Sequence, residues 1–196
     1  MTVILDYGMG NLRSVENVFK AMGGGTAIQT DLSGASRLVI PGVGAFGAAM
    51  ERLSPLASDI RKAAADGLPI LGICLGQQLL FDRSEEFGEH SGLGLIGGDV
   101  TYFPKGLDVK VPHVGWNSLC YRRHDGIATG GESGEQVYFV HSLVTRCSDP
   151  STVVATSEHG IEFASIVGKG NVWGCQFHPE KSGAVGLRLL RNFLAC

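Results

Sequence analysis

Short apolar runs alternate with helix-like stretches in the first half of the chain, and this alternation limits the fold more than any other feature. The runs are residues 2–8, 37–44 and 69–74, and we expect the second to be interrupted at Pro41 and Gly42. Residues 10–24, 46–66 and 75–84 predict helices, the middle one interrupted near Pro55. Strands that are apolar on both faces, with helices between them, indicate a parallel sheet covered on both sides.

The second half of the chain is β-rich and predicts mixed or antiparallel strands and hairpins. Its short strand-like stretches are separated by Gly, Pro, Asp or His and span residues 92–104, 109–121, 135–146, 151–158, 161–170 and 171–180. Residues 182–195 predict a closing amphipathic helix. We find no repeat and no linker, so we expect one α/β domain over residues 1–196. Ligands of such sheets gather at the carboxyl ends of the strands.

Composition excludes several classes of function. Of the 196 residues, 44% are apolar, and a formal charge of −3 without a Lys/Arg-rich run argues against nucleic-acid binding. No apolar run approaches the length of a membrane span, and the first residues do not resemble a signal peptide. The five cysteines are scattered without a CxxC pair, so we expect no zinc site, no disulfide framework and a reducing cytoplasm.

The segment GICLG places Cys74 between Gly72 and Gly76, at the end of a predicted strand and the start of a predicted helix. This spacing is typical of a nucleophile elbow, where the strand turns sharply and side chains two positions away would clash with the crossing backbone. A helix start favours thiolate, and the N–H of Leu75 is free to face a developing oxyanion. The alternative is a buried structural cysteine.

The segment HPE near the end of the chain supplies a candidate base. Pro179 favours extended geometry at His178, and residues two apart in an extended segment point to the same side. Glu180 then accepts from the imidazole and orients it, so Cys74, His178 and Glu180 form a nucleophile, base and orienting acid. The alternative is a simple turn.

The segment IPGVG follows a predicted strand and supplies a candidate second oxyanion donor. Its glycines allow the backbone to approach a ligand closely. We assign this role to the N–H groups around Val43 and Gly44, and a plain Pro-Gly turn is the alternative. We expect the oxyanion hole not to be preformed, because the glycines of this segment allow a peptide flip at modest cost.

Together, PGVG, GICLGQQLL and HPEKS resemble the class I glutamine amidotransferases. DYGMGNL, SEE, GLGLIGGDV, PHVGWN and YFVHS, in order along nearly the whole chain, are similar to the glutaminase subunits of imidazole glycerol phosphate synthase. The resemblance implies a three-layer, flavodoxin-like α/β fold with a mostly parallel central sheet and added antiparallel strands in the second half.

The resemblance also implies the reaction and the partner. Cys74 attacks the side-chain amide of glutamine, a γ-glutamyl thioester forms, and water releases glutamate. Ammonia passes to a (β/α)₈-barrel cyclase subunit, which makes imidazole glycerol phosphate and an aminoimidazole carboxamide ribotide. The pair is a heterodimer that acts in histidine biosynthesis, and neither a cofactor nor a metal is expected.

By the same resemblance, glutamine is held by the elbow helix and by two backbone segments, through Gly42, Gly44, Gln78, His141 and Ser142. Asn11, Trp116 and Lys181 match positions near the subunit interface, although Trp116 is also compatible with a core position and Lys181 with a solvated charge. The family commonly reads YFVHSY, and Leu143 stands here in place of the last tyrosine.

Three other functions are compatible with the motifs. A paralogue keeps the glutaminase chemistry but feeds ammonia to another barrel, for example in amidino-sugar synthesis. A catalytically idle subunit only binds its partner, and the intact Cys74, His178 and Glu180 argue against it. A free-standing cysteine hydrolase disagrees with the narrow motifs.

Overall fold

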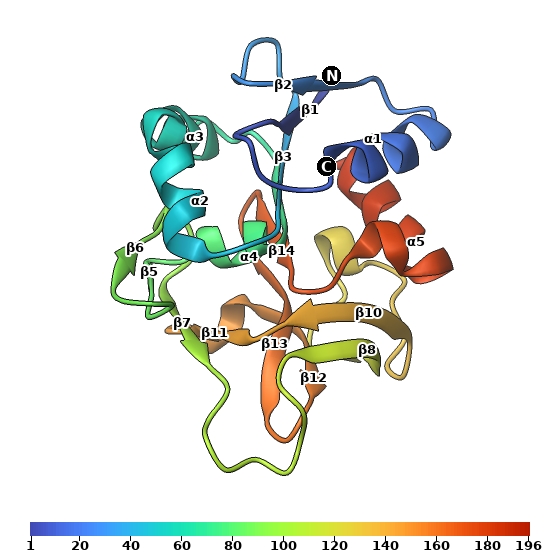
Figure 1. Ribbon diagram of the computed structural model, residues 1–196. Helices are drawn as coiled ribbons and strands as arrows, with labels where there is room; N and C mark the ends of the chain where they lie inside the picture. Colours follow the sequence, from blue (N-terminus) through green and yellow to red (C-terminus); the bar gives the residue numbers. More distant parts are fainter.

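The structure is a computed structural model that describes all residues from 1 to 196, and a large central sheet runs through it (Figure 1). The main-sheet strands are β1 (Thr2–Leu5), β2 (Thr26–Gln29), β3 (Arg37–Gly42), β4 (Ile70–Cys74), β9 (Cys120–Tyr121), β12 (Val153–Glu158), β13 (Glu162–Lys169) and β14 (Val172–Cys175). The helices are α1 (Leu12–Ala21), α2 (Phe46–Leu53), α3 (Ala57–Ala65), α4 (Leu75–Leu79) and α5 (Gly183–Ala195). Short 3₁₀ turns are η1 (Ser54–Leu56), η2 (Gly126–Ala128), η3 (Pro150–Thr152) and η4 (Pro179–Lys181).

The strand order of the main sheet is β2-β1-β3-β4-β14-β13-β12-β9. The first five strands are parallel, and this part has the 2-1-3-4-5 order of a flavodoxin-like sheet. From β14 outward the pairs are antiparallel. The predicted mostly parallel sheet with antiparallel additions from the second half is therefore confirmed.

Helices cover both faces of the parallel part of the sheet. In Figure 1, α1 and α5 lie on one side of β1, β3 and β4, while α2 and α3 lie on the other. Alternate strand residues enter two buried clusters. One cluster holds Ile4, Val39, Leu71 and Ile73 with Phe19 and Phe193, and the other holds Val3, Leu5, Leu38, Ile40 and Ile70 with Phe46, Leu53 and Ile60. These two cores establish the predicted three layers.

Two smaller sheets stand beside the main one, as predicted for the second half of the chain. β8 (His113–Ser118) pairs antiparallel with β10 (Gln136–His141). The other sheet has the order β11-β7-β5-β6 and contains β5 (Arg83–Ser84), β6 (His90–Ser91), β7 (Gly98–Tyr102) and β11 (Leu143–Cys147). No helix of the structure is both long and apolar enough to cross a membrane.

Two local predictions were wrong, and one strand was not predicted. The apolar run 37–44 is not interrupted at Pro41, because β3 continues to Gly42. Pro41 is tolerated since β1 pairs only with Arg37 to Val39, so the missing N–H faces a side without a neighbouring strand. The edge strand β2 was not predicted, because its four residues are all only half-buried and carry no apolar pattern.

The predicted helix over residues 75–84 is also shorter, because α4 ends at Leu79. The cause lies in a distant segment. The N–H of Leu93 donates to Leu79 O, and those of Gly94 and Leu95 donate to the carbonyls of Phe81 and Leu80. These bonds hold the backbone after α4 in a turn, so the chain leaves the helix and forms β5 instead.

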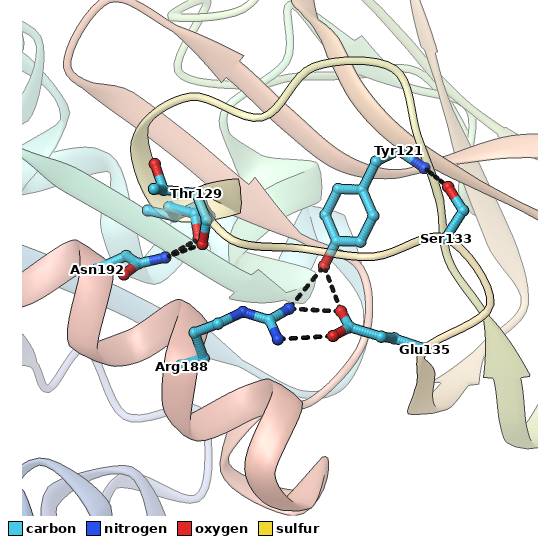
Figure 2. A network of polar contacts seen from close by, with 7 residues as sticks. Tyr121, Thr129, Ser133, Glu135, Arg188 and Asn192 are labelled. Atoms are coloured by element: carbon cyan, nitrogen blue, oxygen red, sulfur yellow. Dashed lines mark hydrogen bonds and ion pairs between the residues drawn. The ribbon is translucent and has the colours of Figure 1, made fainter.

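A polar network fastens α5 to the loops around β9 and β10 (Figure 2). The Arg188 guanidinium forms a two-pronged ion pair with Glu135, and one nitrogen also donates to the Tyr121 hydroxyl at 3.3 Å. One turn further, the Asn192 amide donates to the carbonyls of Ile127 and Thr129 at 2.9 and 2.8 Å. The last helix is therefore tied to the antiparallel half of the molecule as well as to the parallel sheet.

Candidate active site

Cys74 lies on a sharp turn between β4 and α4, as the glycine spacing predicts. Its backbone is in a positive-φ conformation (φ 56°, ψ −111°), which is uncommon for a residue other than glycine. A Cβ on Gly72 would lie 2.4 Å from the carbonyl oxygen of Gly76, and a Cβ on Gly76 would lie 1.8 Å from that of Ile40. Both glycines are therefore required by the crossing backbone of the turn.

The groups around the Cys74 sulfur come from three parts of the chain. The thiol donates to Val140 O in β10 at 3.7 Å, and Gln176 Nε2 lies 4.0 Å from the same sulfur. α4 has only five residues, so the dipole at its N-terminus is weaker than that of the predicted longer helix. The neighbouring thiol of Cys175 is shut inside the core, and burial raises its pKa.

His178 and Glu180 meet through η4. His178 is extended (φ −97°, ψ 96°), as expected before proline, and its Nδ1 lies 2.8 Å from Glu180 Oε1. The backbone also fixes this histidine, because its N–H donates to Tyr138 O in β10. Burial disfavours the imidazolium, but hydrogen bonding to Cys74 and then to Glu180 outweighs it and raises the pKa of His178 to about 9. The imidazolium form of His178 is therefore favoured at neutral pH.

One cavity of about 300 Å³ joins these groups at the carboxyl ends of β3 and β4. Its lining residues are Val43, Gly44, Cys74, Leu75, Gln78, Glu86, Pro112, Val140, His141, Ser142, Leu143 and His178. The cavity is of a size for a small amino acid, and polar side chains line it together with Cys74. Glu180 lies behind His178, with its side chain 2% exposed.

Most of the residues expected around the nucleophile line this cavity. Gln78, His141 and Ser142 face it, as do the oxyanion candidates Val43 and Leu75. Gly42 does not line the cavity, because its Cα faces the Tyr7 hydroxyl and α4. Any contact of Gly42 with a ligand therefore has to come from its peptide groups.

The expected interface residues lie outside the cavity. Asn11 caps α1 by accepting from Ser14 N, Trp116 is 56% exposed and packs edge-on against Tyr138, and Lys181 is exposed in η4. η4 contacts α1 and β10, and the Trp116–Tyr138 pair joins β10 to β8. These three residues thus belong to adjoining elements.

Sequence reasoning did not single out Glu86, which also lines the cavity. Its Oε2 accepts from the backbone N–H of Phe46 at 2.5 Å, so it caps α2, whose own N-cap Ala45 has no side chain to do so. Glu86 is the one acidic residue among those that line the cavity. The SEE segment just after α4 was the available signal.

His141, which lines the cavity, belongs to a series of buried hydrogen bonds. His141 Nδ1 lies 2.7 Å from Leu143 O, which only accepts, so Nδ1 carries the proton. In neutral rings, His141 Nε2 then accepts from His113 Nδ1 at 2.9 Å, and His113 Nε2 accepts from the Asn117 amide at 3.3 Å. Burial lowers the pKa of His113 to about 4 and that of His141 to about 3, so both rings are neutral at pH 7.

Comparison with known proteins agrees with this fold and cavity. Residues 4–196 match the family described as glutamine amidotransferase class-I. The chain belongs to the class-I glutamine amidotransferase family.

Within that family, the chain is most usefully compared with proteins called imidazole glycerol phosphate synthase subunit HisH. The protein of that name from Syntrophotalea carbinolica is 48% identical over 203 residues, covering 98% of both chains. The one from Aquifex aeolicus is 48% identical over 198 residues, covering 98% of this chain and 95% of the relative.

Solved structures of lower identity show the same fold. A crystal structure of a glutamine amidotransferase superimposes with a TM-score of 0.76 at 22% identity, covering 99% of this chain and 97% of the other. A chain in the structure of PurLQS from Thermotoga maritima gives 0.77 at 20% identity, covering 99% and 96%.

Proposed function

We propose that this chain is the glutaminase subunit of an imidazole glycerol phosphate synthase, and that residues 1–196 form its single amidotransferase domain. The observation that carries the proposal is the cavity in which Cys74, on a strained turn, meets the His178–Glu180 pair. Near-full-length identity of 48% to subunits of that name supports the same assignment.

The first half of the reaction uses Cys74 as nucleophile and His178 as proton carrier. The sulfur attacks the side-chain carbonyl of glutamine, and the C–N bond of the tetrahedral intermediate breaks as His178 gives its proton to the departing ammonia. Glu180 keeps Nδ1 of the imidazole occupied, so Nε2 is the nitrogen left for the reaction. The product on the enzyme is a γ-glutamyl thioester.

The second half hydrolyses the thioester. His178, now neutral, takes a proton from water, the hydroxide adds to the thioester carbonyl, and the C–S bond breaks to give glutamate and the Cys74 thiolate. In both halves the carbonyl oxygen becomes an oxyanion, for which the N–H groups of Leu75 and of Val43 or Gly44 are the candidates. Gly44 has φ +108°, a conformation that leaves the 43–44 peptide free to reorient at low cost.

The cavity suits the amino-acid end of glutamine. The Glu86 carboxylate and the Gln78 amide oxygen are acceptors for the ammonium group. The backbone around His141 and Ser142 is the candidate for binding the carboxylate. Leu143 lines the same wall with a buried side chain, and its carbonyl holds His141. An apolar residue at this position therefore keeps the backbone contact that the wall requires.

The face of β8 and β10 supports docking of a (β/α)₈-barrel cyclase subunit. Val114 and Trp116 in β8 and Val140 in β10 are 57%, 56% and 38% exposed, and register pairs Val140 with Val114. Val140 also accepts from the Cys74 thiol and lines the cavity, so this apolar face adjoins the nucleophile. A partner on this face would receive ammonia without its release to solvent.

The compartment we propose is a reducing cytoplasm. All five cysteines are unpaired in the fold, and three of them are not buried.

The test is glutamate release from glutamine by the chain alone, and then with the cyclase barrel and its nucleotide ligand. Cys74→Ala is the control. We expect weak activity alone and strong Cys74-dependent activity in the pair. Unchanged activity with that barrel would instead favour a paralogue with another ammonia acceptor, and failure of a thiol-reactive glutamine analogue to label Cys74 would favour an idle subunit.

A further inference from the structure

Gln176 is a fully buried amide whose two ends both point at groups of the cavity. It follows β14, and its backbone N–H donates to Ser165 O in β13 at 2.9 Å, which fixes its place in the sheet. Its Oε1 accepts from Gln78 Nε2 at 3.0 Å, and its Nε2 lies 4.0 Å from Cys74 Sγ. No solvent reaches the side chain, so these two partners account for its polar atoms.

The chemistry of the sulfur fixes the orientation of both amides. The Cys74 S–H is directed at Val140 O, and a thiolate has no hydrogen to donate, so in either form the sulfur accepts from Gln176 and the Gln176 atom that faces it is the NH₂ group. The oxygen of Gln176 then faces Gln78, which has to present its own NH₂ group in return. Gln78 Oε1 is left as the amide atom available to a ligand in the cavity.

We propose that Gln176 is a positioning residue that turns the Gln78 oxygen toward the cavity for the free α-ammonium group of the substrate and directs its own N–H at Cys74. The inference rests on the proposed glutaminase function and deepens it. A single buried chain then runs from substrate ammonium through Gln78 and Gln176 to the sulfur. Each hydrogen bond in such a chain polarises the next, so binding of the ammonium strengthens the donor at the thiolate.

This series of hydrogen bonds predicts a specificity for substrates that carry an α-amino group. Without Gln176, the Gln78 amide is free to rotate by half a turn and to present NH₂ to the cavity, where it repels an ammonium. Replacement by methionine, Gln176→Met, keeps the length and removes both hydrogen bonds. Replacement by glutamate, Gln176→Glu, keeps an oxygen that accepts from Gln78 but removes the donor to Cys74 and faces it with an acceptor.

Two measurements on the complex with the cyclase subunit test the two ends of this hydrogen-bonded series separately, the Gln78 end and the Cys74 end. The first is the ratio of kcat/KM for glutamine to that for its deamino analogue, glutaramic acid. The second is the pH midpoint for alkylation of Cys74 by iodoacetamide. We expect Gln176→Met to lower the ratio about tenfold and to raise the midpoint. We expect Gln176→Glu to keep the ratio close to that of the wild type and to raise the midpoint further.

Gln77→Met is the matched control, because Gln77 is the adjacent buried glutamine of α4 but donates to Thr145 Oγ1, away from the cavity. It should move neither readout. If Gln176→Met lowers kcat/KM for both substrates equally and leaves the midpoint in place, Gln176 acts only as core packing and the proposal is wrong. The proposal is also wrong if Gln176→Glu lowers the ratio of kcat/KM for glutamine to that for glutaramic acid as much as Gln176→Met does.

The same measurements distinguish failure of this proposal from failure of the glutaminase assignment. In that case the wild-type complex would release no glutamate. The alkylation midpoint would still shift in both Gln176 variants if the link to Cys74 is correct, and would stay unchanged if it is not.

Discussion

The Cα of Gly76 lies so close to the carbonyl of Ile40 that an added Cβ would be 1.8 Å from the oxygen. The contact joins the first turn of α4 to the neighbouring strand β3, and it involves backbone on both sides. Neither partner is able to move aside as a flexible side chain would. The position of Cys74 over the cavity therefore depends on the absence of a single methyl group.

Gly76→Ala should lower the free energy of unfolding by about 3 kcal/mol or more, because the overpacked backbone has to shift. In the protein that still folds, glutaminase activity should fall by about a hundredfold, since the elbow carries Cys74, the proposed nucleophile. Urea unfolding and glutamate release measure the two effects. Gly25→Ala is the control, because no atom lies within 4 Å of its added Cβ, and a change above about 0.5 kcal/mol is not expected there. Equal stability of the two variants would show that the turn relaxes freely.

Glu180→Gln should lower the pKa of His178 from about 9 and reduce glutamate release, because the carboxylate is one of the groups that stabilise the imidazolium. A histidine pKa above its unfolded value of 6.5 contributes stability that is complete below pH 6.5 and is lost as pH rises through about 9. The decline in stability over that window should therefore be shallower in the variant. NMR titration of the imidazole and urea unfolding at several pH values measure this. Glu51→Gln, at an exposed site on α2, should leave both unchanged.

Local chemistry made much of the site predictable from the sequence. The positive φ of Cys74 and the crowding at Gly72 and Gly76 follow from the spacing of two glycines around one residue. The pairing of His178 with Glu180 follows from Pro179 between them. In each case the cause lies within a few residues of the effect, so a pattern in the sequence carries it.

The features that were missed depend on distant segments. α4 ends at Leu79 because residues 93–95 bond to the backbone that follows it, and nothing within residues 75–84 signals this. Glu86 enters the cavity because it caps α2, which lies some 40 residues earlier in the chain. Gln176 appears in the sequence as one more residue of a buried strand, and its contact with Gln78 spans 98 positions. Such contacts are set by the tertiary fold alone.

The free energy of unfolding should fall as the pH is lowered from about 6.5 toward 4, because His113 and His141 are held neutral in the fold. Their pKa values of about 4 and about 3 lie below the unfolded value of 6.5, so the unfolded chain takes up protons first. The stability they contribute is present above pH 6.5. His113→Asn removes one of the two groups and should reduce the slope, measured by urea unfolding between pH 6.5 and 5. An identical slope in the variant and the wild type would contradict the hydrogen-bonded chain, and His124→Asn at an exposed site serves as the control.

Arg188→Met should destabilise the fold by about 2 kcal/mol, because it leaves Glu135 partly buried without its two-pronged partner and removes a donor to Tyr121 (Figure 2). The side chains of this pair are 28% and 18% exposed. Arg83→Met breaks a similar pair with Asp99, whose side chains are 60% and 42% exposed, and should cost less than about 1 kcal/mol. Urea unfolding at low and moderate salt measures both. A larger loss in Arg83→Met would mean that burial does not set the strength of these pairs.

Trp116→Ala should weaken the proposed complex with a cyclase subunit by about tenfold or more, because large exposed aromatic side chains dominate protein interfaces. Trp116 is 56% exposed and rests edge-on against Tyr138, whose carbonyl also holds the backbone of His178. A partner that covers this indole therefore lies against Tyr138 in β10, the strand that is hydrogen-bonded directly to the backbone of His178, the proposed base. Calorimetric titration of the two subunits measures the affinity, and a thermal melt of the chain alone should show little change. Lys62→Ala, on the exposed side of α3, is the control, and equal affinities for the two variants would place the proposed partner on another face.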